Sequence, residues 1–159
     1  MVLGVAGCGS DDSESSTSTG APESAQSSAS DDTTSAIGDA CEILTDAEVT
    51  DLIGDHGPGT PSSRGTDGPG CFWENPETYY SVTIDIGNPD TAINGTLPPL
   101  PEGIGADPLP DGMRDLGGAV EFAAGGRYNS VQVVNGESSD AQQQLAIELA
   151  RKVAAQLGG

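Results

Sequence analysis

The chain has 159 residues, of which 25 are acidic and 5 are basic, so its formal net charge is −20. This charge argues against a nucleic-acid partner, because a phosphate backbone would be repelled and the sequence has no basic stripe to bind it. The length suits one ordinary domain with a tail, and no stretch approaches the ~20 consecutive apolar residues that a transmembrane helix requires.

The first eight residues contain small side chains followed by a cysteine. The segment Val5-Ala6-Gly7-Cys8 looks like a lipobox, the site at which bacterial lipoproteins are cleaved and lipidated. Small residues fit the peptidase cleft, the Cys8 thiol accepts the lipid, and two or more acyl chains give stable anchoring. We therefore expect residues 1–8 to be a truncated lipoprotein signal. The protein would then be lipid-anchored to the cell membrane on its extracytoplasmic face.

Two interpretations of this start remain open. The residues before Cys8 are too few to contain both a charged region and an apolar region of ~7–15 residues. A lipoprotein signal here therefore implies that translation starts upstream of Met1. The alternative is that Cys8 is an ordinary cysteine beside a chance match.

Residues 9–38 form a low-complexity segment. By count, 14 of these 30 residues are Ser or Thr, six are Asp or Glu, and none is basic. Such a composition cannot bury enough apolar surface to offset the entropy lost on ordering the chain. We expect a disordered tether that spans roughly 30 Å and lifts the domain off the bilayer if Cys8 carries lipid. Its hydroxyl groups could also carry O-linked glycans.

The globular domain is expected over residues 39–159 and begins with a short helix. Thr45 and Glu48 match a capping box, in which each side chain satisfies a free backbone N–H at the helix start. Gly54 is a natural C-terminal stop. Between them, one face of the helix is apolar and consists of Val49, Leu52 and Ile53.

Four β-strands are predicted in two hairpins, because apolar and polar residues alternate with a period of two. Their ranges are 71–75, 79–86, 119–123 and 129–134. Residues 55–70 are rich in glycine and proline and are predicted to be a connector. Residues 88–112 are a long proline-rich stretch, predicted to be either a binding loop or a cover for the sheet edge.

A second helix is predicted from Ser139, which forms a capping box with Gln142. Its apolar residues recur at intervals of four and are Leu145, Leu149, Val153 and Leu157. The order of elements indicates an α+β domain. We expect a small antiparallel sheet of about four strands, with the N-terminal and C-terminal helices packed on one face and one disulfide.

The disulfide expectation comes from the three cysteines of the sequence. If Cys8 carries lipid, Cys41 and Cys71 remain as a pair, and in an exported protein such a pair is expected to be oxidised. Closing a loop of about 30 residues stabilises a fold by roughly 3–4 kcal/mol in the chain-entropy model. A two-cysteine metal site is the alternative, but the sequence offers a single histidine and no C-x-x-C motif. No metal or cofactor is expected.

No group of residues in the sequence suggests catalysis. His56 is the single histidine, and a triad would need a nucleophile and an orienting carboxylate around it. Asp107 and Asp111 would act as an acid–base pair only if the fold placed them in different environments. A partial match to a calcium loop involves Asp85, Asn88 and Asp90.

Several motifs of the domain resemble a known family. They are Cys41-x-Ile-Leu-Thr45-x-x-Glu48-Val49, Cys71-x-Trp73, Asp115-Leu116-Gly117 and the C-terminal helix. Over roughly residues 39–159 the chain resembles the actinobacterial cell-envelope lipoproteins grouped as domain of unknown function 3558. The resemblance implies an envelope lipoprotein and transfers no catalytic residue. The chain is also similar to the extracellular sensor domains of some actinobacterial Ser/Thr kinases, which place a cleft between helices and sheet. The proline-rich residues 88–112 depart from the family pattern.

Three hypotheses of function follow. The first is a non-catalytic, membrane-anchored envelope protein that binds a small apolar or amphiphilic ligand or an envelope protein partner. The second is a purely structural or interaction lipoprotein without a pocket, and the third is a cell-wall hydrolase. A deep apolar cleft would favour the first over the second, whereas the third requires a convergent acid, base and nucleophile.

Overall fold

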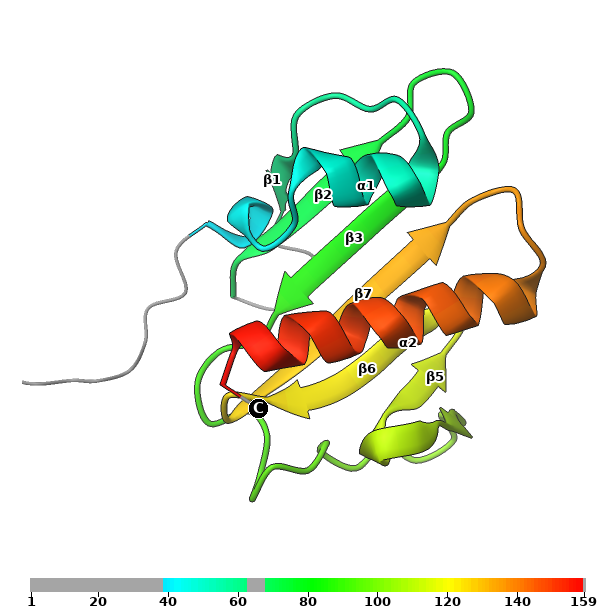
Figure 1. Ribbon diagram of the computed structural model, residues 1–159. Helices are drawn as coiled ribbons and strands as arrows, with labels where there is room; N and C mark the ends of the chain where they lie inside the picture. The colour runs from blue at the N-terminus through cyan, green and yellow to red at the C-terminus, as the bar shows by residue number, and fades with distance from the viewer. Residues whose placement is uncertain (1–38, 63–67, 159) are drawn as a thin grey trace, which may run out of the picture. The chain divides into compact units, whose positions relative to one another are not determined.

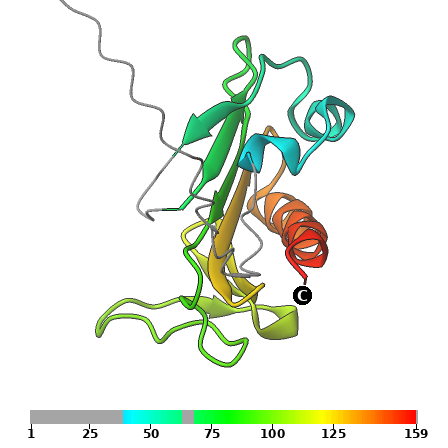
Figure 2. The ribbon, with the colours of Figure 1, turned by 90° about the vertical axis from the view of Figure 1, so that its left-hand side faces the viewer.

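The computed structural model describes residues 39–62 and 68–158. Within them a seven-stranded antiparallel sheet carries two α-helices on one face (Figure 1 and Figure 2). The helices are α1 (Asp46–Ile53) and α2 (Ser139–Gln156), and two short 3-10 turns are η1 (Ala40–Glu42) and η2 (Pro110–Gly112). The strands are β1 (Thr60–Ser62), β2 (Gly70–Glu74), β3 (Ser81–Ile86), β4 (Asp107–Pro108), β5 (Arg114–Leu116), β6 (Ala119–Ala124) and β7 (Arg127–Val134).

The prediction of a small sheet of about four strands is wrong. The strand order is β1-β2-β3-β7-β6-β5-β4, so the sheet continues beyond the four long strands at both edges. The three additional strands are two or three residues long, which is too short for an alternating pattern to be visible in the sequence. They form because a neighbouring strand presents free backbone groups, and Pro61 is tolerated in β1 because that strand lies at the edge.

The four long strands and both helices lie where their sequence patterns place them. The alternation in the central strands directs one set of side chains toward the helices, where they are at most 2% exposed: Val82, Ile84, Ile86, Val120, Phe122, Val131 and Val133. They form one core with the buried face of α2, which includes Ala146, Ala150 and Val153. The strand expected from Tyr79 begins at Ser81, because Tyr79 has a φ of 60° and belongs to the preceding turn.

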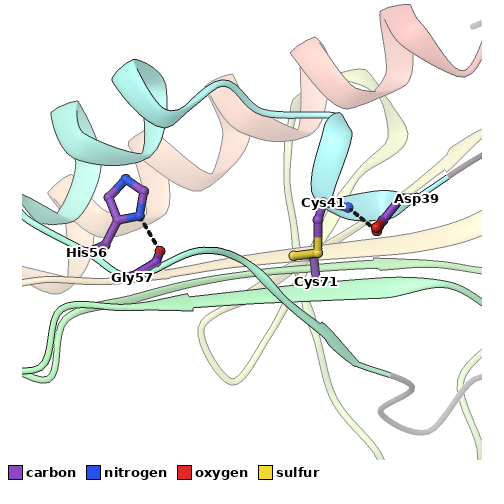
Figure 3. The surroundings of a disulfide bond; sticks show 5 residues. All are labelled: Asp39, Cys41, His56, Gly57 and Cys71. Carbon is purple, nitrogen blue, oxygen red and sulfur yellow. Dashed lines mark hydrogen bonds between the residues drawn. A yellow bond between two sulfur atoms is a disulfide. The ribbon is translucent and has the colours of Figure 1, made fainter.

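Cys41 and Cys71 form the expected disulfide, with their Cα atoms 5.1 Å apart (Figure 3). The bond joins η1 to β2, and Cys71 is fully buried beside Trp73. Gly59 lies directly over both residues, since a Cβ at this position would come within 2.6 Å of Cys71 Sγ and Trp73 Nε1. The N-terminal end of the domain is thereby fixed to the sheet.

Candidate functional site

An open groove of about 910 Å³ lies between α1 and α2. Figure 1 shows the two helices side by side in front of the sheet, and Figure 2 shows both on the same side of it. A smaller hollow of about 200 Å³ shares four lining residues with the groove and extends it. We call the two together the interhelical groove. The volume of the larger hollow falls within the roughly 300–1,000 Å³ typical of small-molecule sites.

The interior of the interhelical groove is apolar. Leu52 on α1 and Leu145 on α2 line both hollows and remain partly exposed. Ile53 and Tyr80 add to the larger hollow, and the smaller one is lined by Leu44 and Leu149. A ligand that covers these side chains removes apolar surface from water, and this removal favours binding.

Two asparagines hold α1 at one end of the groove. Asn75 Nδ2 donates to the Ile53 carbonyl at 2.9 Å, and Asn135 Nδ2 donates to the Leu52 carbonyl at 3.3 Å. These carbonyls belong to the last turn of α1, which has no helical partner for them. Asn75 Oδ1 also accepts from the backbone N–H groups of Glu77 and Thr78, so the same residue shapes the β2–β3 turn.

An ion pair joins the helices at the other end of the groove. Lys152 of α2 contacts the Glu48 carboxylate of α1. The same carboxylate accepts from the Thr45 backbone N–H at 2.9 Å, which completes the capping box predicted for this helix. The α1 wall of the groove is therefore held by specific polar contacts at both ends, and one of these contacts joins it to α2.

The roles of Asn75 and Asn135 were not predictable from the sequence. Each is followed by a turn-forming residue, Pro76 or Gly136, so each would be interpreted as a turn signal at the end of a strand. Their bonds to α1 are long-range, and no local pattern reports such a contact. A Cβ at Gly136 would overlap the Tyr80 hydroxyl, so any larger residue there would force Tyr80 to move.

His56 lies outside the groove, on the connection after α1. Its Nδ1 is 2.7 Å from the Gly57 carbonyl (Figure 3), and its Nε2 is 3.1 Å from the Asp46 carbonyl. Both ring nitrogens therefore face backbone acceptors, and neither faces a hydroxyl or thiol. This arrangement pins the connection to the first turn of α1 and resembles no triad.

The remaining carboxylates singled out in the sequence are dispersed. Asp111 is exposed and pairs with Arg151 of α2 at 2.8 Å, while Asp107 lies in β4 opposite Asp115. Asp85 is in β3, whereas Asp90 is exposed in the following loop. Among residues 39–62 and 68–158, no three His, Cys, Asp or Glu side chains form a cluster that could hold a metal ion.

A second polar cluster lies on the sheet face away from the helices. Glu121 is 3% exposed, and its carboxylate accepts from Arg114 Nε at 2.5 Å and from the Tyr128 hydroxyl. Arg114 also donates to the Pro98 carbonyl at 2.7 Å, which attaches the long proline-rich loop to the sheet. This cluster was not predicted from the sequence, because Glu121 alternates with the apolar Val120 and Phe122 as a solvent-facing strand residue would.

Burial raises the pKa of Tyr128 to about 12, and its hydrogen bond to Glu121 acts in the same direction. The folded state therefore favours the protonated phenol, whose pKa in an unfolded chain is ~10. This contribution to stability is fully present below pH ~10 and is lost as the pH rises through about 12.

The motif Asp115-Leu116-Gly117 has a structural role. Asp115 Oδ1 accepts from the Gly118 backbone N–H at 2.9 Å, and Oδ2 accepts from Gln143 Nε2 of α2 at 2.8 Å. The motif therefore forms the β5–β6 turn and fixes it to the second helix.

The lipobox with Cys8 and the tether of residues 9–38 lie outside the described residues. Over the described part of the chain, neither helix has both the length and the hydropathy needed to cross a bilayer.

Comparison with known proteins identifies the family. The family model described as protein of unknown function (DUF3558) matches residues 3–156. No curated protein and no solved structure matches the chain. Since the family model covers nearly the whole chain, the protein belongs to the DUF3558 family.

Proposed function

We propose that this protein is an exported actinobacterial lipoprotein, anchored through Cys8 to the extracytoplasmic face of the cell membrane, which binds an amphiphilic ligand in the interhelical groove without catalysing a reaction. The lipobox-like residues and the resemblance described above support the anchor. The single observation that carries the binding role is the groove itself, a solvent-open apolar site of ligand size between two fixed helices.

The lining of the groove supports binding in preference to catalysis. Its side chains are aliphatic, aromatic, amide, hydroxyl and carboxylate groups, with one lysine that is already paired to Glu48. A hydrolase would need a nucleophile held by a base, which is in turn held by an orienting group. No such relay is formed by the groove residues in the described part of the chain.

An envelope protein is the second candidate for what the domain binds. Ile93 and Ile104 of the long loop are 61% and 51% exposed, and Tyr79 of the β2–β3 turn is 73% exposed. Large apolar side chains on loops are typical anchors at protein interfaces. They lie apart in sequence and do not line the groove, so this role would use a different surface.

The anchor is tested by replacing Cys8. In an actinobacterial host that expresses the gene with its upstream region and is supplied with labelled palmitate, the unchanged chain should incorporate the label and Cys8→Ala should not. The unchanged chain should also enter the detergent phase on phase partitioning. Equal incorporation of label by Cys8→Ala would contradict lipid anchoring at this residue.

Filling the groove should weaken ligand binding. Ala141 of α2 lines the groove, so Ala141→Trp places an indole in its interior. In the 159-residue chain with Cys8→Ser, we expect at least about a tenfold loss of affinity for a neutral fluorescent probe of apolar surfaces. Lipid retained from an envelope extract, observed by native mass spectrometry, should fall in parallel.

The matched control is Ala47→Trp. Ala47 lies on α1 and is exposed, but it does not line the groove. This variant should bind the probe and the lipid as the unsubstituted chain does. Equal binding by Ala141→Trp and Ala47→Trp would place the ligand elsewhere and reject the groove as the site.

A further inference from the structure

We infer that the interhelical groove selects an amphiphile with a cationic head group and an apolar chain. This inference rests on the proposed function, because it assigns a ligand class to the same site. It follows from the charges on the rim of the groove and from the pairing of Lys152, the one cation among the described residues that line the groove, with Glu48.

Carboxylates flank the apolar interior from both helices. Asp51 of α1 and Glu148 of α2 line both hollows, as Leu52 and Leu145 do, so the two acids border the middle of the groove. Glu137 stands at the end of the larger hollow, after β7. An alkyl chain lying on the leucines would thus hold its head group beside carboxylates from opposite walls.

Among the described residues, none of these three carboxylates forms an ion pair, although Lys152 lies one helical turn from Glu148 on α2. Lys152 is the cation that lines the groove, and Glu48 holds it in an ion pair. Within residues 39–62 and 68–158, no hydrogen bond or ion pair engages the carboxylates of Asp51, Glu137 or Glu148. A cationic head group would supply the missing charge, whereas an anionic one would add repulsion.

The same charges disfavour occupants that come from the protein itself. Residues 9–38 carry six acidic side chains and no basic one, and a second copy of the chain carries a net charge of −20. Fatty acids and anionic phospholipid head groups are disfavoured for the same reason. An aliphatic chain with an amine or quaternary ammonium group satisfies both the apolar interior and the acidic rim.

The volume favours a small amphiphile over a peptide helix. The larger hollow of about 910 Å³ is within the range of small-molecule sites. At one end the groove is bounded by the two asparagines bonded to α1, and at the other end by the Glu48–Lys152 pair. A cationic amphipathic helix would have to extend past these contacts, so it is the competing outcome of the test.

The test compares head groups on one chain length, with the 159-residue Cys8→Ser protein. Three surfactants compete with the bound neutral probe at low salt, each below its micelle concentration. They are dodecyltrimethylammonium, dodecyl maltoside and dodecyl sulfate. We expect the cationic surfactant to bind about tenfold more tightly than the neutral one, and the anionic one to bind most weakly. Added salt should reduce the cationic advantage. Spermine, which has charge but no apolar chain, should not displace the probe.

Two charge variants locate the effect. Asp51→Asn with Glu148→Gln should bring the ratio of the affinities for dodecyltrimethylammonium and dodecyl maltoside close to one. The control is Glu102→Gln with Asp107→Asn, which removes the same charge from exposed positions that do not line the groove. This control should keep the preference.

The outcomes separate the two proposals. Equal binding of all three head groups, or a preference that survives Asp51→Asn with Glu148→Gln, overturns the charge selection but leaves the groove as a binding site. Failure of every surfactant to displace the probe overturns the proposed function as well. Displacement by a cationic amphipathic peptide at concentrations where the cationic surfactant fails overturns the small-amphiphile assignment.

Discussion

Removal of the disulfide should lower the free energy of unfolding by about 3–4 kcal/mol, as the loop-closure entropy of a bond between residues 30 positions apart requires. The change is Cys41→Ala with Cys71→Ala. The loss should be at least this large, because Cys71 is fully buried and its removal also leaves space beside Trp73. For a domain of this size the loss is a large fraction of the total stability.

Urea unfolding monitored by fluorescence is the measurement. Trp73 is the single tryptophan of the chain and packs close to the bond, so its emission reports on the affected region. Reduction of the unsubstituted protein should produce a similar loss, and Cys8→Ala should produce none. A change below about 1 kcal/mol on both removal and reduction would show that the bond contributes little to the fold.

Replacement of Glu121 by leucine should destabilise the protein by about 3–5 kcal/mol. The carboxylate is buried and is the partner of both Arg114 and Tyr128, so its loss leaves a largely buried guanidinium and a phenol without their acceptor. Glu74→Leu is the matched control, because Glu74 is an exposed strand residue. Its effect should stay within about 0.5 kcal/mol.

Two further measurements identify the cause of the loss. Adding Arg114→Met to Glu121→Leu should recover most of the stability, since no unpaired charge then remains buried. The pKa of Tyr128 should fall part of the way from about 12 toward ~10, followed by phenolate absorbance, because burial, the larger cause of its rise, is retained. If Glu121→Leu unfolded at the same urea concentration as Glu74→Leu, the cluster would have no role in stability.

Local signals in the sequence were sufficient for the main elements of this fold. The capping box of Thr45 and Glu48 and the stop at Gly54 depend on neighbouring residues, so they placed α1 correctly. The alternation in residues 81–86 placed β3 in the same way, since a period of two is a local property. The pairing of Cys41 with Cys71, expected for an exported protein, is confirmed.

The edge strands were not visible in the sequence, because a strand of two or three residues has no period to detect. Strand β5 exists because Arg114 and Leu116 lie opposite Glu121 and Ala119 of β6. Strand β1 likewise depends on pairing with β2. Whether such a short segment becomes a strand depends on the neighbouring strand with which it pairs. That neighbour is distant in the sequence or follows a turn whose geometry the sequence does not specify.

The candidate site also depends partly on local sequence patterns and partly on long-range contacts. By itself, the sequence determined the charge of the chain, predicted its disulfide and placed the elements that carry the groove residues. Only the tertiary structure brought Leu52 together with Leu145, and Asp51 together with Glu148, from segments more than 90 residues apart in the chain. Periodicity assigns each of these residues to a face of its own helix. Which faces meet, and whether a groove stays open between them, depends on long-range contacts such as those of Asn75 and Asn135 with the end of α1.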